Sequence, residues 1–365
     1  MAILVGIVGK TNVGKSTFFS AATLVSVDIS NHPFTTIKAN VGVGYLRKKC
    51  VCTEFEVKDN PQNSICIKGF RFIPIKLYDV AGLIPGAHKG RGLGNKFLDD
   101  LRQADALIHI VDAAGSTDAN GRPVPPGTHD PLEDVMFVER EVDLWLYQIL
   151  SRDWKRIART VDAGTKDLVT ALCERLAGLS IDRQHIIEAL RQCKLESSKA
   201  SSIREEELLA LSSNIRKISK PMLIAANKSD LPEARDTIKR MREELKGKYT
   251  VVPVSAISEL ALRKASKAGL LEYLPGDPDF KVIRLEALTK RQRKGLEYIK
   301  DRVLAKWGST GVQDVINKAF FELLDMIVVY PVEDPTTLTD HKGNVLPDAF
   351  LVRRGTTVRQ LAYMI

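Results

Sequence analysis

The sequence predicts an α/β fold with a mostly parallel sheet, and three observations lead to this prediction. Short apolar runs recur along the chain, helical or loop segments separate them, and the first run leads through a glycine-rich turn into a helical pattern. Strands that alternate with helices pair in parallel, because the intervening helix returns the chain across the sheet.

The first strand is expected at residues 3–8, and the helix that follows it at residues 16–24. Further buried strands are expected where short apolar runs are bounded by turn or polar residues, at residues 72–78, 106–111, 222–226 and 250–254.

Two long segments interrupt this alternation. Residues 113–129 are rich in glycine and proline, which indicates a loop, and residues 132–218 carry helical patterns with no strand signal. The simplest interpretation is an all-helical insertion between two strands of the sheet.

Two more segments follow the last expected strand. Residues 261–324 are helical and basic, and residues 328–365 have the pattern of a strand, a turn, a strand and a helix. A β-grasp unit would need further strands, so we expect this C-terminal unit to be incomplete.

The composition excludes several classes of protein. The 365 residues are 44% hydrophobic and 27% charged, which is typical of globular domains and unlike disordered, collagen-like or coiled-coil chains. No run approaches about eighteen apolar residues, and the N-terminus has neither the basic start nor the cleavage site of a signal peptide. A cytoplasmic protein without a membrane span is therefore expected.

The five cysteines are too few, and odd in number, for a secreted disulfide framework. Three of them, Cys50, Cys52 and Cys66, could hold a metal only with a fourth ligand, which the sequence does not identify. The alternation of residue types at 51–57 favours a strand there instead.

The strongest motif is GKTNVGKS at residues 9–16, which lies between the first strand and the first helix, as a phosphate-binding loop requires. Its glycines allow backbone amides to converge on phosphate oxygens, and the helix N-terminus adds its positive dipole end. Lys15 is expected to reach the β and γ phosphates, and Ser16 to bind Mg²⁺. The expected nucleotide contacts in this region are Gly9, Asn12, Val13, Gly14, Lys15, Ser16 and Thr17.

Two further motifs follow predicted strands. In DVAG at residues 79–82, Asp79 can hold Mg²⁺ through water while the Gly82 amide contacts the γ phosphate. In NKSD at residues 227–230, the Asp230 carboxylate can accept hydrogen bonds from N1 and N2 of guanine, where adenine would present an acceptor. Two such charged hydrogen bonds, at roughly 1.5 to 3 kcal/mol each, supply about two to four decades of preference for guanine.

The remaining contacts expected at the base come from the ends of the strands at 222–226 and 250–254. Asn227 would brace the phosphate loop, Lys228 would lie along the base, and Ser255 with Ala256 would offer a backbone amide to guanine O6. The order and spacing of these motifs are those of a GTPase.

With these motifs, the sequence resembles the YchF subfamily of Obg-like, translation-associated GTPases. The resemblance covers essentially the whole chain and includes GKTNVGKSTFF from Gly9, NHPFTT at residues 31–36, DVAGLIPGAHKGRGLGNKF at residues 79–97, NKSD from Asn227 and a C-terminal TGS-like segment. It implies a P-loop GTPase fold with an all-helical insertion and a C-terminal β-grasp domain of the TGS type.

The resemblance also implies roles for the switch regions. Thr36, with Thr35 as the nearby alternative, would bind Mg²⁺ together with Ser16 and Asp79, and residues 83–97 would form the second switch. Bacterial and eukaryotic members usually carry glutamate at the position of Asp230 and can prefer ATP, so the aspartate here corresponds to archaeal members.

Three residues, Lys15, Thr36 and Gly82, are expected to act on the γ phosphate. Leu83 stands where Ras-like enzymes have the glutamine that orients the attacking water, and a leucine has no donor or acceptor. Slow intrinsic hydrolysis is therefore expected.

Another group must then assist hydrolysis. His88 and His129 lie in glycine- and proline-rich loops, from which either could reach the γ phosphate or merely be solvated. Asn12 could bind a K⁺ ion beside the phosphates, or it could only brace the loop by hydrogen bonding.

The charge of the chain favours an anionic partner. The formal net charge is +9, and residues 234–306 alone contain eighteen Lys or Arg and ten Asp or Glu, a net charge of +8. A solvated helix face would account for this, but the resemblance to ribosome-associated GTPases favours ribosomal RNA, bound through shape and charge. No membrane binding and no reading of a DNA sequence are expected.

The expected function is a Mg²⁺-dependent switch that binds GTP, hydrolyses it to GDP and phosphate, and binds the ribosome or its RNA. The alternatives are a purine NTPase that also uses ATP, and a nucleotide-gated binding module with negligible turnover. The expected domains are the first part of the GTPase domain at 1–130, the helical insertion at 131–218, the second part with basic helices at 219–327, and an incomplete TGS-like domain at 328–365.

Overall fold

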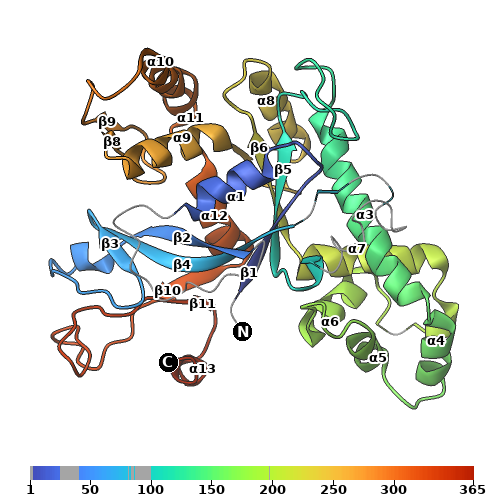
Figure 1. Cartoon of the computed structure of the whole chain (residues 1–365). Coiled ribbons are helices and arrows are strands. Elements are labelled where there is room, and N and C mark those ends of the chain that lie inside the picture. Colours follow the sequence, from blue (N-terminus) through green and yellow to red (C-terminus); the bar gives the residue numbers. More distant parts are fainter. Residues whose placement is uncertain (1–2, 25–40, 81, 84–85, 87–99, 197) are drawn as a thin grey trace.

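The computed structural model describes residues 3–24, 41–80, 82–83, 86, 100–196 and 198–365. In this part of the chain, the centre is a seven-stranded sheet in the order β2-β4-β1-β5-β6-β7, with β3 paired to β4 (Figure 1). The strands are β1 Leu4–Val8, β2 Val41–Lys49, β3 Ile65–Ile67, β4 Phe70–Asp79, β5 Ala106–Asp112, β6 Met222–Asn227 and β7 Val251–Pro253.

The five strands that the sequence predicts form the parallel part of this sheet, in the order β4-β1-β5-β6-β7. β2 and β3 pair antiparallel with β4 and were not predicted. The glycines and the basic end of VGVGYLRKK hide β2, because neither is typical of a strand interior.

The expected strand pattern at residues 51–57 is wrong. Val51–Thr53 is a short 3₁₀ helix, η2, whose turn is closed by backbone hydrogen bonds from Glu54 and Phe55 to Val51. The chain therefore leaves the sheet after β2 and returns to it at β3, which brings residues 50 and 66 to the same end of the sheet.

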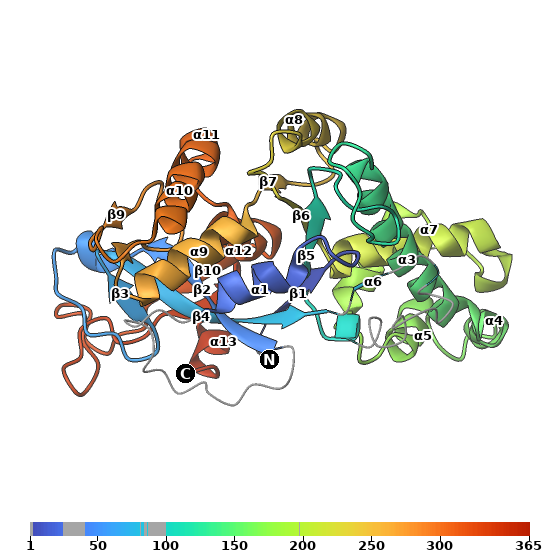
Figure 2. The same ribbon diagram turned by 45° about the horizontal axis from the view of Figure 1, so that its top comes forward.

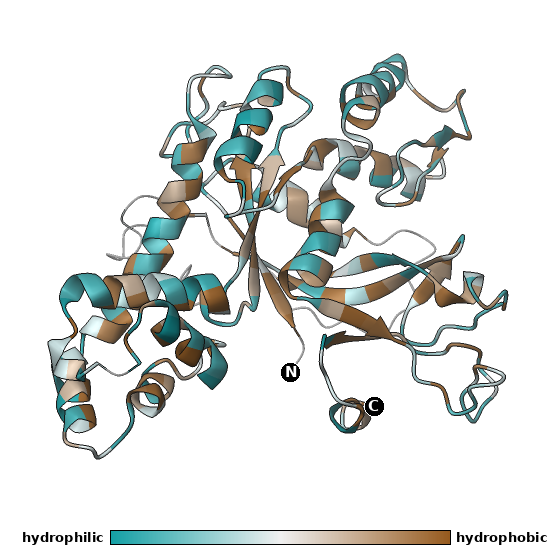
Figure 3. Ribbon diagram, turned by 180° about the vertical axis from the view of Figure 1, so that it is seen from behind, coloured by the Kyte–Doolittle hydropathy of each residue, from teal (hydrophilic) through white to brown (hydrophobic). Residues whose placement is uncertain are grey.

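Helices cover both faces of the parallel strands. On β5, Ile108 and Ile110 pack in one core with α1 (Lys15–Thr23) and α12 (Val312–Lys318). On the opposite face, Leu107 and Val111 pack with α3 (Pro131–Ser151), α7 (Glu205–Ser219) and α8 (Ala234–Glu244). Burial on both faces explains why these strands are continuous apolar runs in the sequence, and the central strands are correspondingly hydrophobic in Figure 3.

The segment at 132–218 is helical, as expected. Its helices are α3, α4 (Trp154–Asp162), α5 (Leu168–Arg175), α6 (Arg183–Gln192) and α7, which lie together beside the sheet (Figure 2). The Asp130 side chain accepts a hydrogen bond from the Leu132 amide, and Pro131 occupies the first turn of α3. This N-cap fixes where the helices begin after the loop at 113–129.

The expectation of a purely helical segment at 261–324 is only partly confirmed. It contains α9 (Ala256–Lys267), α10 (Lys290–Ile299), the π-helical η5 (Lys300–Leu304), α11 (Ala305–Trp307), α12 and the π-helical η6 (Ala319–Leu323). Between α9 and α10, however, β8 (Leu271–Glu272) and β9 (Lys281–Val282) form a small antiparallel pair. Leu271 and Tyr273 are buried in a separate core with Leu262 of α9, which holds this pair in place.

The C-terminal segment has the expected order of strand, turn, strand and helix. β10 (Met326–Val329) pairs antiparallel with β11 (Phe350–Arg353), and α13 (Val358–Ala362) follows. Two strands are only part of a β-grasp sheet, so the β-grasp assignment stays a prediction. None of the helices in the described residues has the length and apolar character needed to span a bilayer.

Candidate nucleotide-binding site

The predicted motifs meet at the carboxyl ends of the parallel strands. The phosphate loop follows β1, Asp79 ends β4, Asn227 ends β6, and Ser255 follows β7. This edge is where open α/β sheets bind ligands, because the strand ends and helix N-termini converge there.

Two glycines are required by the shape of the phosphate loop. Gly9 has φ 145° and Gly14 has φ 98°, a range that other residues rarely adopt. A Cβ atom on Gly14 would collide with Nδ2 of Asn227, and one on Gly9 would collide with the Ile110 carbonyl. The loop therefore packs too tightly against β5 and β6 for any larger residue at these positions.

Lys15 is nearly buried at the start of α1. Its Nζ donates to the Lys10 carbonyl at 2.7 Å. Burial lowers the pKa of Lys15 to about 8, and the nearby Asp79 carboxylate opposes this shift. The ammonium group is thus held within the loop where phosphate oxygens would arrive.

Ser16 and Asp79 lie together, as a shared Mg²⁺ site requires. Ser16 Oγ donates to Asp79 Oδ2 at 3.2 Å. The other carboxylate oxygen, Oδ1, is buried and has no hydrogen-bond partner among the described residues. A hydroxyl and a carboxylate with an unused oxygen are the hard ligands that suit Mg²⁺. Thr36 and Thr35, the expected third ligand and its alternative, lie outside the described residues.

Gly82 and Leu83 have different surroundings. A Cβ atom on Gly82 would lie 2.7 Å from Cγ2 of Thr11 and 3.2 Å from Nζ of Lys15, so the residue lies directly beside the phosphate loop. The Leu83 amide donates to the Gly9 carbonyl at 3.1 Å, and its side chain is buried in the core with Val8. A buried leucine cannot orient water, which agrees with the prediction from the sequence.

Asn227 joins the phosphate loop to the loop after β7. Its Nδ2 donates to the Val13 carbonyl at 2.8 Å, as expected of a brace, and its Oδ1 accepts from the Ala256 amide at 3.1 Å. The Ala256 amide was expected to serve guanine O6. In this structure it already has an acceptor, so O6 would have to share it or use another amide of the first turn of α9.

Asp230 and Lys228 are both held by neighbouring hydroxyl groups. Asp230 Oδ1 accepts from Ser255 Oγ at 2.7 Å, which orients the carboxylate. Lys228 Nζ donates to Asp112 Oδ2 at 2.9 Å and to Ser116 Oγ at 2.8 Å, so its stem is fixed across the end of β5. These contacts hold both side chains of the NKSD segment in place at this edge of the sheet.

Aromatic residues from the basic helices support the same loop, and sequence reasoning missed them. Trp307 Nε1 donates to the Ser229 carbonyl at 3.1 Å, and the Tyr298 hydroxyl donates to the Asp230 carbonyl at 2.9 Å. No motif could have shown this, because the contacts span about seventy residues and involve only backbone carbonyls of the NKSD segment.

The loop at 113–129 also contacts the phosphate loop, which the sequence did not indicate. Thr11 Oγ1 donates to the Asn120 carbonyl at 3.1 Å, and Asn12 Nδ2 donates to the Gly121 carbonyl at 2.9 Å. Asn12 therefore acts as a brace in this structure. Lys10 Nζ donates to the Thr117 carbonyl at 2.9 Å, so three side chains of the phosphate loop hold this segment.

His129 has a defined partner. Its Nε2 lies 2.8 Å from Asp134 Oδ1, and Asp134 Oδ2 forms an ion pair with Lys10 Nζ at 2.8 Å. The simple solvated histidine considered above is therefore wrong for His129, because the ring is tied to the phosphate loop through Asp134 and Lys10. His88, the other histidine considered, lies outside the described residues.

Comparisons with known proteins give the family. A model described as 50S ribosome-binding GTPase matches residues 4–141, and one described as the G4 motif-containing domain of YGR210-like Obg-like GTPases matches residues 225–334. The GTP-binding protein MJ1332 of Methanocaldococcus jannaschii is 52% identical over 362 residues, which cover 99% of this chain and 90% of that protein. The ribosome-binding ATPase YchF of Bacillus subtilis is 32% identical over 284 residues, covering 75% of this chain and 72% of that one. The chain belongs to the YchF-type Obg-like GTPase family.

Two solved structures share the fold of this chain. A GTP-binding protein from Pyrococcus horikoshii, 42% identical, matches with a TM-score of 0.78 over 100% of this chain and 89% of its own. The YchF GTPase of Schizosaccharomyces pombe matches with a TM-score of 0.55 at 20% identity, over 99% of this chain and 83% of its own, which supports the fold alone. The P-loop GTPase fold predicted from the sequence is thus confirmed.

Proposed function

We propose that this chain is a Mg²⁺-dependent switch that binds GTP and hydrolyses it slowly to GDP and phosphate. The observation that carries the proposal is the double hydrogen bond of Asn227, to Val13 of the phosphate loop and to Ala256 beside the base-reading loop. Because one side chain spans both loops, a nucleotide would be held by its phosphates and its base at once.

The choice of guanine rests on Asp230. Its carboxylate, oriented by Ser255, offers the two acceptors that match N1 and N2 of guanine. The names of the relatives differ on this point: MJ1332 is called GTP-binding, whereas the Bacillus subtilis relative is called an ATPase. The aspartate favours GTP, and a purine NTPase that also uses ATP is the alternative.

The remaining residues of the site would bind either the metal ion or the phosphates. Ser16 and Asp79, with Thr36, would hold Mg²⁺, which neutralises charge between the β and γ phosphates when bound. Lys15 would contact the same phosphates, and the Gly82 amide would contact the γ phosphate. With Leu83 buried, no group at that position orients water, so we expect slow hydrolysis until a partner completes the site.

Binding measurements with GTP and ATP side by side test the nucleotide assignment. The unmutated protein is expected to bind GTP at least about 100-fold more tightly than ATP, from two charged hydrogen bonds. Asp230→Glu should weaken GTP binding and reduce the preference, because the longer side chain misplaces both acceptors. Lys15→Ala should weaken the binding of both GTP and ATP.

A matched control is Asp236→Glu, the same change at an exposed position on the neighbouring α8, which should alter neither affinity. Equal affinities for GTP and ATP in the unmutated protein would refute the guanine assignment and favour the purine NTPase.

The ribosome is the partner that we propose, which also requires a cytoplasmic location. The proposal is supported by the names of the YchF relatives and by the exposed basic residues of α10. Sedimentation with ribosomes in GDP and in a non-hydrolysable GTP analogue should show more binding with the analogue. Single-turnover hydrolysis with and without ribosomes tests the other alternative, because negligible turnover in both would indicate a nucleotide-gated binding module.

A further inference from the structure

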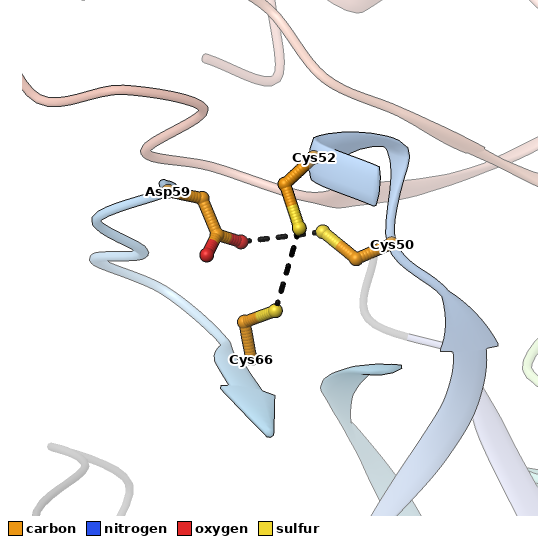
Figure 4. Close-up of side chains that lie close together, drawn as sticks. All are labelled: Cys50, Cys52, Asp59 and Cys66. Carbon is orange, nitrogen blue, oxygen red and sulfur yellow. Dashed lines mark hydrogen bonds between the residues drawn. The ribbon is translucent and has the colours of Figure 1, made fainter. Parts of the chain in front are cut away.

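Three cysteines and one aspartate converge at one end of the sheet, and none of them belongs to the nucleotide motifs. Cys50 follows β2, Cys52 lies in η2, Asp59 lies in the loop after it, and Cys66 is in the middle of β3 (Figure 4). Their ligand atoms all lie within 4.8 Å of one another. The fourth ligand that the sequence could not identify is thus Asp59, which the turn at η2 brings back to the cysteines.

The distances fit a tetrahedral metal site. With Zn–S bonds of about 2.3 Å and a slightly shorter Zn–O bond, two sulfurs lie about 3.8 Å apart and a sulfur and an oxygen about 3.5 Å apart. The observed distances are 3.7 Å between Cys52 Sγ and Cys66 Sγ and 3.2 Å between Cys50 Sγ and Asp59 Oδ2. The four side chains therefore need little movement to share one ion.

The surroundings supply the outer hydrogen bonds and charge that such a site needs. Arg71 is fully buried; its guanidinium donates to Asp59 Oδ2 at 2.8 Å and lies 3.4 Å from Cys50 Sγ through Nε. Three thiolates and a carboxylate around a divalent ion carry a net charge of about −2, and a buried arginine offsets part of it. The same guanidinium donates to Ser64 Oγ at 3.0 Å and to the Leu346 carbonyl at 3.1 Å, so its position is fixed.

We propose that Cys50, Cys52, Asp59 and Cys66 form a structural site for Zn²⁺, or for another thiophilic divalent ion of similar size. All four ligands come from the protein, so the coordination is closed and the role is structural. Cys50 and Cys52 pack with Leu346. The Arg71 guanidinium carbon lies 5.3 Å from the centre of the Tyr330 ring. The ion would therefore join the loop between β2 and β3 to the C-terminal segment.

The protonation of the thiols gives the site a pH dependence. Cysteine binds metal ions as the thiolate, so metal binding must release the thiol protons, and the affinity falls as the pH falls. The apparent Zn²⁺ affinity should therefore be lower at pH 6 than at pH 8.

Metal analysis and titration test the proposal on the full chain. Protein purified with reductant and without chelator should contain about one Zn²⁺ per chain. After the ion is removed, Co²⁺ should produce a thiolate-to-metal charge-transfer band and the visible bands of tetrahedral cobalt. Cys66→Ser should weaken Zn²⁺ binding by more than about 100-fold, since even outer partners of metal ligands are worth 10- to 100-fold.

The matched control is Cys173→Ser, a partly buried cysteine on α5 outside the cluster, which should keep the full Zn²⁺ content. Guanine-nucleotide binding, measured on each variant, reports whether the chain is folded, since the cluster is separate from that site. A second variant, Asp59→Ala, tests the fourth ligand if Cys66→Ser fails to fold.

Two outcomes would overturn the proposal. The first is folded protein that neither contains nor takes up Zn²⁺ or Co²⁺. The second is protein purified without oxygen that has three titratable thiols after denaturation in place of five, with the missing pair mapped to the cluster, because two of its sulfurs would then form a native disulfide.

Discussion

Single side chains set the chemistry of the nucleotide site, and most of them act on the backbone of distant residues. Asn227 donates a hydrogen bond to the Val13 carbonyl. Lys228 donates one to the Asp112 carboxylate, and Asn12 donates one to the Gly121 carbonyl. Each of these hydrogen bonds also fixes the position of a loop at this edge of the sheet.

Lys15 makes nucleotide binding depend on pH. Its pKa is lowered to about 8 by burial, and phosphate oxygens beside the ammonium would raise it again. Binding therefore takes up a proton above pH 8, and the dissociation constant of GDP should rise by up to about tenfold per pH unit from there.

Titration calorimetry of GDP binding from pH 7 to 9 measures this effect, and buffers of different ionisation enthalpy give the proton uptake directly. Lys15→Met should lose both the pH dependence and most of the affinity. An affinity that is constant from pH 7 to 9 would contradict the prediction.

Activation by K⁺ stays a prediction that depends on Asn12. The side-chain carbonyl would contribute one oxygen to the ion, whose charge would replace the help that Leu83 cannot give. GTP hydrolysis should then be faster in K⁺ than in Na⁺ at equal ionic strength, and Asn12→Ala should remove the difference while GDP binding persists. Equal rates in both salts, with and without ribosomes, would show that Asn12 is only the brace seen here.

The site could be predicted from the sequence wherever a motif is local. Asp79 and Asn227 end apolar strands and Lys15 follows one after a short glycine-rich loop, so their place at the edge of the sheet was implied by the strand pattern. Trp307 and Gly121 could not be predicted, because they approach the site through tertiary packing and each contact is made to or by a backbone carbonyl. Asp59 was missed for a similar reason: a single carboxylate in a loop has no pattern of its own.

At the scale of elements, α10 is the most basic exposed surface among the helices discussed here. Lys290, Arg291, Arg293 and Lys294 are all exposed, but they are not equivalent. Arg293 donates to the Leu285 carbonyl at 2.8 Å and to the Leu288 carbonyl at 3.2 Å, so it holds the segment before the helix. The other three are available to an anionic partner.

Reversing the charge of Lys290, Arg291 and Lys294 to glutamate should weaken ribosome association and flatten its salt dependence by about one unit of slope per lost phosphate contact. GTP affinity should stay the same, because these side chains lie away from the phosphate loop. Co-sedimentation at several salt concentrations measures both quantities.

Arg152, Lys155 and Arg159, exposed at the start of and along α4, provide a control with the same change in charge. Their reversal should leave ribosome association intact. If both triple variants bind with the same strength and salt slope as the unmutated protein, α10 is only a solvated surface.

The elements that were predicted and those that were missed differ in a physical way. β1, β5, β6 and β7 are almost wholly buried and β4 is mostly buried, so their sequences are largely apolar. β2 and β3 lie at an edge, where one face or one side meets solvent and the hydrophobic pattern weakens. The π-helical η5 and η6 leave no signal in the sequence that separates them from α-helix.

At the scale of the whole molecule, a buried ionic group joins the helical insertion to the rest of the chain. Arg216 of α7 pairs with Asp143 at 2.6 Å and with Glu139 at 3.3 Å, both on α3. Glu139 also pairs with Lys248 at 2.7 Å and accepts from the Tyr249 hydroxyl, in the segment before β7. The insertion is thereby fixed to the sheet as well as packed against it.

Arg216→Met should lower the free energy of unfolding by about 3 to 5 kcal/mol, because Asp143 loses its counter-charge and Glu139 keeps only its pair with Lys248. Urea denaturation measures the change. Arg204→Met, which removes an exposed pair with Glu207, should cost less than about 1 kcal/mol. Similar losses for both variants would show that burial does not govern this network.

The order of strands in the sheet determines when each strand can pair with its neighbour during synthesis of the chain. β5 pairs with β6 through Leu107 and Met222. About 115 residues must therefore be synthesised after Leu107 before β5 can pair with β6. At about 5 to 20 residues per second, the edge of β5 stays unpaired for roughly 6 to 23 s. The brace at Asn227 and its acceptor contact with Ala256 come later still. Guanine nucleotide held by these contacts can therefore stabilise the chain only after residue 256 of 365 has been added, and it cannot help the first half of the molecule to fold.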